Sequence, residues 1–434
     1  MRKIAITCAM FACCAMLSAQ QQWSLDKCID HAISYNLNIK QQENNVEQQR
    51  ISLNTSQNNR LPSVSANGSE GLGFGRGLTA NNTYANRNTQ STSFNLGADV
   101  PLYTGGQLSN QIKVNRLNLQ AAIADLSRAK ESLAMQVMSA YLEAIYQKDL
   151  VEVNERQKAL SEAQLLRVEK LFRNGKEAES QVAEMRSQVA AADLQLTQQQ
   201  NNAMLALLDL SQLLELQSPE GFDIVRPDAP DASSVLLMNP DAVYAEALGV
   251  KPQIEADKYR LQSAEKSVDV AKAGYYPSVH LSAGMGSSYY KTSGFEAASF
   301  SRQMKDNFNQ SLSLSLNIPI FDRFSTRNNV RQARLQVQNQ QLQMDETKKT
   351  LYKEIQQAYY NALAAQKQCI SSDAALKSSQ ESFNLMEKKF ENGKATATEF
   401  QESRTNFLNA ESTFLQSRYT FMFREKILNF YRGR

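Results

Sequence analysis

Histidines and cysteines are the residues in which metal-binding or catalytic chemistry would first show in this chain. The two histidines, His31 and His280, lie far apart in the 434-residue sequence. Zinc sites take three or four His, Cys or carboxylate ligands, usually at short spacings, so these residues predict no metal cluster. Cys28 and Cys369 fall on expected helices in different halves of the chain. They could form a disulfide, but two free thiols packed as small apolar side chains are the favoured interpretation.

The glycine-rich stretch Gly71–Gly77 (GLGFGRG) is similar in letters to a phosphate-binding loop. Such a loop must lead into a helix whose N-terminus holds the phosphate, whereas this stretch lies in a polar strand and loop region. No nucleophile signature occurs either. The formal charge of +3 gives no sign of nucleic-acid binding. The sequence therefore predicts no enzyme, no cofactor and no nucleic-acid partner.

Four segments show the period-two alternation of a strand with one apolar and one polar face. The clearest runs from Phe308 to Ile320, where apolar side chains occupy most even positions and Ser or Asn most odd ones. The others begin near Ser63, Ser93 and Pro277, and a polar loop is expected from Gly75 to Asn88. The apolar sets are Val64, Ala66, Leu72 and Phe74; Phe94, Leu96, Ala98, Val100 and Leu102; Val279, Leu281, Ala283, Met285 and Tyr289; and Leu312, Leu314, Leu316 and Ile318.

The length and pattern of these strands favour a membrane environment. Each exceeds the ~9–11 residues that a tilted strand needs to cross a bilayer. Ser-, Asn- and Gly-rich faces suit water and apolar faces suit lipid. The alternative is a soluble sheet with one buried face, but no expected helix has a broad apolar face to cover it. Four strands cannot close a barrel, so the chain must oligomerise: three copies would enclose a lumen, and two would be largely filled by side chains.

Long helices follow the second and fourth strands. The segment from Thr326 to Asn392 contains no Gly or Pro. It carries apolar residues every seven positions, which is typical of a coiled-coil-like helix. The ladder consists of Ile355, Ala362, Cys369, Leu376, Phe383 and Phe390, and the corresponding residues of a helix from Gln107 to Arg173 are Val137, Ala144, Val151, Lys158, Leu165 and Phe172. We expect return helices at residues 178–216 and 396–431, and further helices at residues 23–60, with a possible break at Asn36–Asn38, and 240–273.

The two halves match each other, which predicts an internal duplication. A shift of 218 residues places Pro319 on Pro101 and Gly393 on Gly175. We therefore divide the chain into a first repeat at residues 20–220 (helix, two strands, long helix, return helix), a crossing segment at 221–239 and a second repeat at 240–434.

Residues 1–19 are expected to be a secretory signal peptide. Arg2 and Lys3 precede an apolar run that is too short to span a membrane. Cleavage after Ala19 would remove three of the five cysteines; lipoprotein processing at Cys13 or Cys14 is the alternative.

The order and spacing of these features resemble the TolC-like outer-membrane efflux family over essentially all of the mature chain. The resemblance is carried by Val100–Leu102 and Ile318–Ile320, which lead into the long helices, and by the turns Phe172–Gly175 and Phe390–Gly393. It implies an α+β membrane protein of a Gram-negative outer membrane: a trimeric twelve-stranded barrel, four strands per chain, continuous with a long periplasmic α-helical barrel. It also implies the exit duct of a tripartite efflux or type I secretion system, with a periplasmic adaptor, an inner-membrane transporter and outer-membrane lipid as partners. A structural periplasm-spanning protein that transports nothing is the alternative.

The resemblance also implies where the functional residues lie. In this family, acidic residues after the second turn form carboxylate rings at the periplasmic constriction, and Glu399 and Glu402 match them, with Glu184 as a third gate candidate. The Arg with which some members hold the gate shut is replaced by Ala395. Glu399 and Glu402 share one helix face, and an idle solvated face is the alternative. The turns expected to dock onto the adaptor are Asn174, Gly175 and Lys176, and Asn392, Gly393 and Lys394.

Overall fold

The computed structural model describes residues 21–78, 82–218, 221–227 and 231–433, so the expected signal peptide and Cys13 and Cys14 lie outside the described residues. The chain divides into two compact units. The sheet unit consists of residues 45–123 and 256–345, and the helical unit of residues 1–44, 124–255 and 346–434. Each unit takes segments from both expected repeats.

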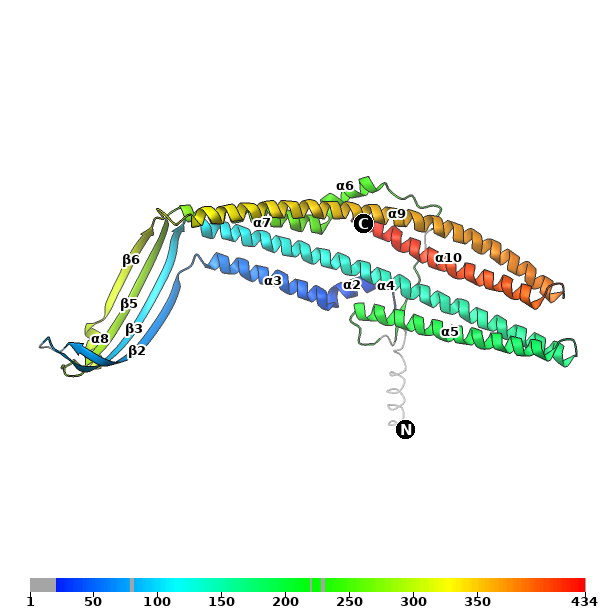
Figure 1. Ribbon diagram of the computed structural model, residues 1–434, viewed down its shortest axis with the longest axis horizontal. Coiled ribbons are helices and arrows are strands. Elements are labelled where there is room, and N and C mark those ends of the chain that lie inside the picture. The colour runs from blue at the N-terminus through cyan, green and yellow to red at the C-terminus, as the bar shows by residue number, and fades with distance from the viewer. Residues whose placement is uncertain (1–20, 79–81, 219–220, 228–230, 434) are drawn as a thin grey trace, which may run out of the picture. The chain divides into compact units, whose positions relative to one another are not determined.

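A four-stranded antiparallel sheet is the centre of the sheet unit (Figure 1). Its strands are β2 (Ser63–Leu78), β3 (Tyr84–Thr104), β5 (Ser278–Thr292) and β6 (Asn309–Asn317), in the order β2-β3-β5-β6. The prediction of a polar loop from Gly75 to Asn88 is wrong, because β2 and β3 remain paired as far as Leu78 and Tyr84. Cross-strand hydrogen bonds between the two segments outweigh the weak strand propensity of Gly and Asn.

The register of the sheet brings the four expected apolar sets onto one face. Leu281 pairs with Val100 on β3 and with Leu314 on β6, and Ala98 pairs with Val64 on β2. Directly paired residues point to the same side of a sheet. Glu70 interrupts this face on β2, but Gln90 on β3 donates a hydrogen bond of 2.8 Å to its carboxylate, and Thr92 donates another. The predicted face assignment thus agrees with the register of all three pairs except at Leu102, where an irregularity in β3 places Tyr103 opposite Val279.

A short helix that the sequence did not predict, α8 (Phe300–Asp306), packs against the part of β5 that extends past Asn309, the first residue of β6. Gln303 bonds both backbone groups of Tyr290, at 3.0 Å and 3.1 Å, and the Asn307 side chain donates to the carbonyl of Ser288 at 2.6 Å. Side-chain amides therefore satisfy the backbone of β5 where β6 no longer reaches it.

The helical unit holds two long hairpins and several shorter elements. Its complete elements are β1 (Gln21–Trp23), α2 (Leu25–Tyr35), α5 (Glu179–Leu213), β4 (Phe222–Ile224), α6 (Pro240–Val250) and α10 (Ala397–Tyr431). Four helices contribute residues to both units: α3 (Leu37–Asn58), α4 (Gln107–Arg173), α7 (Pro252–Lys272) and α9 (Ser325–Glu391), while η1 (Ala273–Tyr275) belongs to the sheet unit. No helix among the described residues is both long and apolar enough to span a membrane.

The hairpins α4–α5 and α9–α10 have different cores. The ladder on α9 is confirmed: Ile355, Ala362, Cys369 and Phe383 are buried, and the rings of Phe383 and Phe407 stack at 5.4 Å. On α4 the expected ladder is buried at Val137 and Ala144 and half-buried at Val151, Lys158 and Leu165. It is wrong at Phe172, which is exposed, and Val153, Ser161 and Val168 are buried beside the expected positions. The buried stripe moves because α4 contacts both α5 and α10, through Gln199 and Tyr419 respectively.

Two further features differ from the sequence expectation, and one expected helix break is confirmed. Trp23 was placed on a helix but belongs to β1, which pairs in parallel with β4. The helix at 23–60 breaks at Asn36, as considered, and its side chain donates to the carbonyl of Leu213 at 3.3 Å. The helix at 240–273 breaks at Lys251, whose ammonium group lies 3.1 Å from the Glu131 carboxylate and 3.6 Å from the centre of the Phe430 ring. These contacts join segments distant in sequence, which local patterns do not encode.

Candidate functional site

Both hairpin turns have the same glycine-dependent backbone geometry. Gly175 has φ +67° and Gly393 has φ +68°, so the expected left-handed conformation is confirmed. The amide of Gly175 donates to Phe172 O at 2.8 Å, and that of Lys176 donates to Leu171 O at 2.9 Å. This pair of bonds defines a Schellman motif, and equivalent bonds from Gly393 and Lys394 close α9. The turns Asn174–Lys176 and Asn392–Lys394 are therefore rigid helix ends with exposed side chains.

The end of α4 is joined to the end of α9. The guanidinium of Arg167 donates to the carbonyl of Glu391 at 3.0 Å and lies 5.7 Å from the centre of the Phe390 ring. A cation at a helix C-terminus satisfies carbonyl groups that lack an intrahelical partner. Arg167 thus connects the two hairpins close to their turns, a role that its half-buried position on α4 did not suggest from sequence.

Glu399 has a structural task at the start of α10. The Thr396 hydroxyl accepts from the Glu399 amide at 3.2 Å, while the Glu399 carboxylate accepts from the Thr396 amide at 2.8 Å, which makes a capping box. The hydrogen bond from the Thr396 amide, followed by the bond from its hydroxyl, lowers the pKa of the Glu399 carboxyl below its usual value. This carboxylate is therefore ionised and oriented by its own helix end.

Glu402 and Glu184 are free of such ties. Both side chains are exposed, and neither has a hydrogen-bond or ion-pair partner within the described ranges. Glu402 lies one turn after Glu399 on α10, whereas Glu184 lies on α5. Of the three gate candidates, these two present unengaged carboxylates.

Arg404 is a buried cation two residues beyond Glu402. Only 1 % of its surface is exposed, and its guanidinium donates to the carbonyl of Gln157 on α4 at 2.9 Å and to the hydroxyl of Ser161. Burial lowers the pKa of Arg404 from its usual value, yet an arginine remains charged at neutral pH. Its counterpart at a shift of 218, Arg186, is exposed and paired with Glu169 at 2.9 Å. The sequence places an arginine at both matched positions and does not distinguish these environments.

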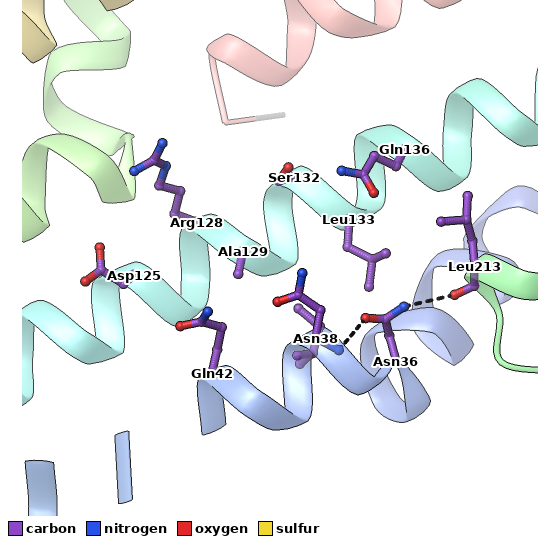
Figure 2. Close-up of a pocket in the computed structure, with 11 residues that line it drawn as sticks. Asn36, Asn38, Gln42, Asp125, Arg128, Ala129, Ser132, Leu133, Gln136 and Leu213 are labelled. Atoms are coloured by element: carbon purple, nitrogen blue, oxygen red, sulfur yellow. Dashed lines mark hydrogen bonds between the residues drawn. The ribbon is translucent and has the colours of Figure 1, made fainter. Parts of the chain in front are cut away.

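A polar cleft of about 610 Å³ lies beside the break between α2 and α3 (Figure 2). Asn38 and Gln42 line it from α3, and Arg128 and Ser132 line it from α4. Asn36, which also lines the cleft, donates to the carbonyl of Leu213 and accepts from the Asn38 amide at 2.9 Å. Besides amides, the walls hold the Asp125 carboxylate, the Arg128 guanidinium and the Ser132 hydroxyl.

The described residues contain no group of three or more His, Cys, Asp or Glu placed to hold a metal ion. His31 and His280 belong to different units. Cys28 and Cys369 are free and buried, as favoured from the sequence, and burial raises the pKa of the Cys28 thiol to about 12. Such thiols are poor nucleophiles at neutral pH.

Comparison with known proteins gives these features a context. The model of the outer membrane efflux protein family matches residues 28–215 and 243–425. The chain belongs to the outer membrane efflux protein family. This membership places it in the outer membrane, among efflux proteins.

Two curated relatives are similar at low identity. The chain is 22% identical to outer membrane protein TolC of Escherichia coli, over 80% of its own length and 71% of the relative's. It is 24% identical to the probable outer membrane lipoprotein SilC of Salmonella typhimurium, over 61% of this chain. The chain spans 55% of the length of SilC and 44% of FusA of Burkholderia cepacia.

Solved outer-membrane proteins have the same fold. A CusC structure superposes with a TM-score of 0.77 at 17% identity, covering 94% of this chain and 91% of CusC. VceC of Vibrio cholerae superposes with a TM-score of 0.73 at 18% identity, covering 94% of this chain and 96% of VceC.

Proposed function

We propose that this chain is the outer-membrane exit duct of a tripartite efflux or type I secretion system and acts as a homotrimer. The observation that carries the proposal is the exposed apolar face of the sheet. Leu312, Leu314 and Val64 are 75%, 67% and 66% exposed on one face. Water would disfavour such a surface, whereas lipid would solvate it. Lipid contact accounts for the face better than a missing soluble layer does.

The two free sheet edges support assembly from three copies. β2 and β6 are the outer strands, and open edges are not viable in lipid because their backbone groups would lack hydrogen bonds. Pairing β6 of one copy with β2 of the next would close a barrel. Three copies give twelve strands, whereas eight strands from two copies leave little room for cargo. The face opposite the lipid, with Ser282 bonded to Asp99 at 2.8 Å, suits a wet lumen.

We also propose that the two halves arose by duplication. In support, α4 and α9 both contain 67 residues, and α5 and α10 both contain 35. Under this proposal the hairpins of three copies form the periplasmic helical barrel, and the crossing segment 221–239 joins the repeats 20–220 and 240–434.

The periplasmic end is proposed to carry both docking and gating. The rigid turns at Gly175 and Gly393 would dock onto the adaptor that links the duct to an inner-membrane transporter. Glu402 is the favoured gate residue, because its carboxylate is unengaged, with Glu184 as its counterpart on the other hairpin. Glu399 would contribute charge while capping α10. Three copies would bring these carboxylates into rings that attract multivalent cations.

Conductance in planar bilayers tests the proposal against its alternative, a periplasm-spanning structural protein. Purified full-length protein should insert as a trimer and give discrete, cation-selective channels. Trimers that insert fully but never conduct, even after Glu402→Gln, would favour the structural role. A monodisperse monomer in detergent with an intact sheet would contradict the barrel.

A further inference from the structure

The turn between β6 and α9 exposes an unusual concentration of apolar surface. Ile320 is 95% exposed, Phe321 71% and Phe324 56%. The two phenylalanine rings pack edge to face, with their centres 5.5 Å apart. All three residues belong to the sheet unit, directly between the end of β6 and the start of α9. An exposed apolar cluster of this kind marks an interaction surface.

The backbone of this turn is strained at two successive positions. Arg323 has φ +57° and Phe324 has φ +62°, a conformation that disfavours residues with a Cβ atom. A shift of 218 places these residues on Gly105 and Gly106, whose φ values are +63° and +83°. The same turn is thus built from two glycines in the first half and from Arg and Phe in the second. Strain that glycine would relieve points to a function for the side chains themselves.

A row of arginines continues from the turn along α9. Residues 323–344 contain Arg323, Arg327, Arg331 and Arg334 but no acidic residue. All four are exposed, and none has an ion-pair partner in the part of the chain that the structure describes. Spacings of four and three residues keep them on one side of the helix. The neighbouring acid, Asp322, is engaged by the Thr326 amide at 2.7 Å.

We propose that this arginine–phenylalanine patch (Ile320, Phe321, Phe324, Arg323, Arg327, Arg331 and Arg334) binds the headgroups of anionic phospholipids at the rim where the sheet meets the helices. The inference rests on the proposed function, since it needs the apolar face of the sheet to lie in lipid. At that rim the apolar side chains reach the acyl chains, and the guanidinium groups meet phosphates. Arginine suits this contact because its planar fork binds phosphate through two hydrogen bonds.

The dimensions and charges fit a lipid better than a second copy of the chain. Arg327 and Arg334 are separated by about 10 Å along the helix, and flexible arginine side chains can reach back to a headgroup layer of roughly 5–8 Å. In the proposed barrel, β6 would face β2 of the next copy. The segment leading into β2 holds Arg60 and has no acidic residue between Glu47 and Glu70. That edge would repel the arginines, whereas anionic lipid would attract them.

The test compares lipid preference of the full-length trimer in neutral detergent. Bound lipid is counted by native mass spectrometry after titration with phosphatidylglycerol, with zwitterionic phosphatidylcholine or with inorganic phosphate. The wild type should prefer phosphatidylglycerol and ignore free phosphate. The triple variant Arg323→Gln, Arg327→Gln, Arg331→Gln should lose about fivefold in affinity for each arginine removed. The matched control, Lys349→Gln, Lys353→Gln, Lys367→Gln, removes three exposed charges farther along α9 and should change nothing.

A second variant separates lipid binding from folding. Arg323→Gly with Phe324→Gly reproduces the turn of the first half and removes the strain, so thermal stability in lipid-free detergent should be kept or raised. Its preference for phosphatidylglycerol should fall.

Equal lipid preference in the wild type and both patch variants would overturn the inference while leaving the channel proposal intact. A glycine variant that loses stability but keeps the preference would assign the turn a structural role and would also overturn it. Failure of the wild type to enter membranes at all would refute the proposed function, and the inference with it.

Discussion

Leu314 and Ser313 provide the sharpest test of which sheet face meets lipid. They are neighbours on β6 and point to opposite faces; Leu314 pairs with Leu281, and Ser313 pairs with Ser282. We compare Leu314→Arg with Ser313→Arg, two substitutions that add the same charge one residue apart. Both positions are exposed in the single chain, so neither substitution disturbs a packed core.

The expected free-energy difference is large. An arginine on the lipid side costs about 2–4 kcal/mol near the midplane and less toward the rims. Leu314 lies in the same cross-strand row as Leu281 and Val100, next to the row of Ala98 on the apolar face. Because this row lies beside the middle of the apolar face, we expect a penalty of about 2 kcal/mol per chain, at the lower end of the midplane range. Three chains would bring the penalty to roughly 6 kcal/mol per trimer. At Ser313 the charge faces the polar side, where Asp99 is bonded to the paired Ser282.

Membrane assembly is measured as the fraction of chain recovered as trimer from the outer membrane. Ser313→Arg should assemble nearly as the wild type does, whereas Leu314→Arg should accumulate unassembled. Equal loss in both variants, or the reverse order, would refute the face assignment. Leu314→Gln is the control for loss of apolar surface without charge and should fall between them.

Three further predictions concern the helical unit. Gly393→Val should impair export but not membrane insertion. No atom lies within 4 Å of the added Cβ, so the backbone strain of about 1–2 kcal/mol is confined to the turn. Gly393→Asn, which tolerates positive φ, should impair export less, and equal defects in the two variants would contradict this. Glu402→Gln should relieve block by trivalent cations, whereas Glu399→Gln should mainly loosen the start of α10 in hydrogen exchange. Cys28 should resist alkylation at pH 8 until the protein is unfolded, and rapid labelling of the native chain would refute its burial.

The sequence predicted what depends on local periodicity. The strand faces, the α9 ladder and the positive φ at Gly175 and Gly393 follow from patterns within one element, and the structure confirms them. Elements held by distant partners were missed. β1 exists because it pairs with β4, and α8 is fixed by Gln303 on the backbone of β5. Neither interaction leaves a period in the sequence.

The functional residues divide in the same way. The turn residues could be found because glycine at a helix end has one common structural meaning. Arg404 could not, because an arginine on a polar helix is normally exposed, and only the proximity of α4 buries it against Gln157 and Ser161. Glu399 illustrates the remaining case: the family resemblance suggested a gate, but Thr396 three residues earlier already gave it a capping role.

At matched positions of the two halves, the backbone conformation is similar but the side chains make different contacts. Gly105 needs to be glycine, because a Cβ there would lie 2.6 Å from the carbonyl oxygen of Ala273. Its counterpart Arg323 keeps the same backbone conformation with a charged side chain. Arg186 and Arg404 differ likewise, one paired in solvent and the other buried. Since the backbone is shared at each pair, the differences must reflect what the side chains contact. We therefore expect Arg323→Gly with Phe324→Gly, which makes the second turn resemble the first, to preserve the fold and to change lipid contact at the rim.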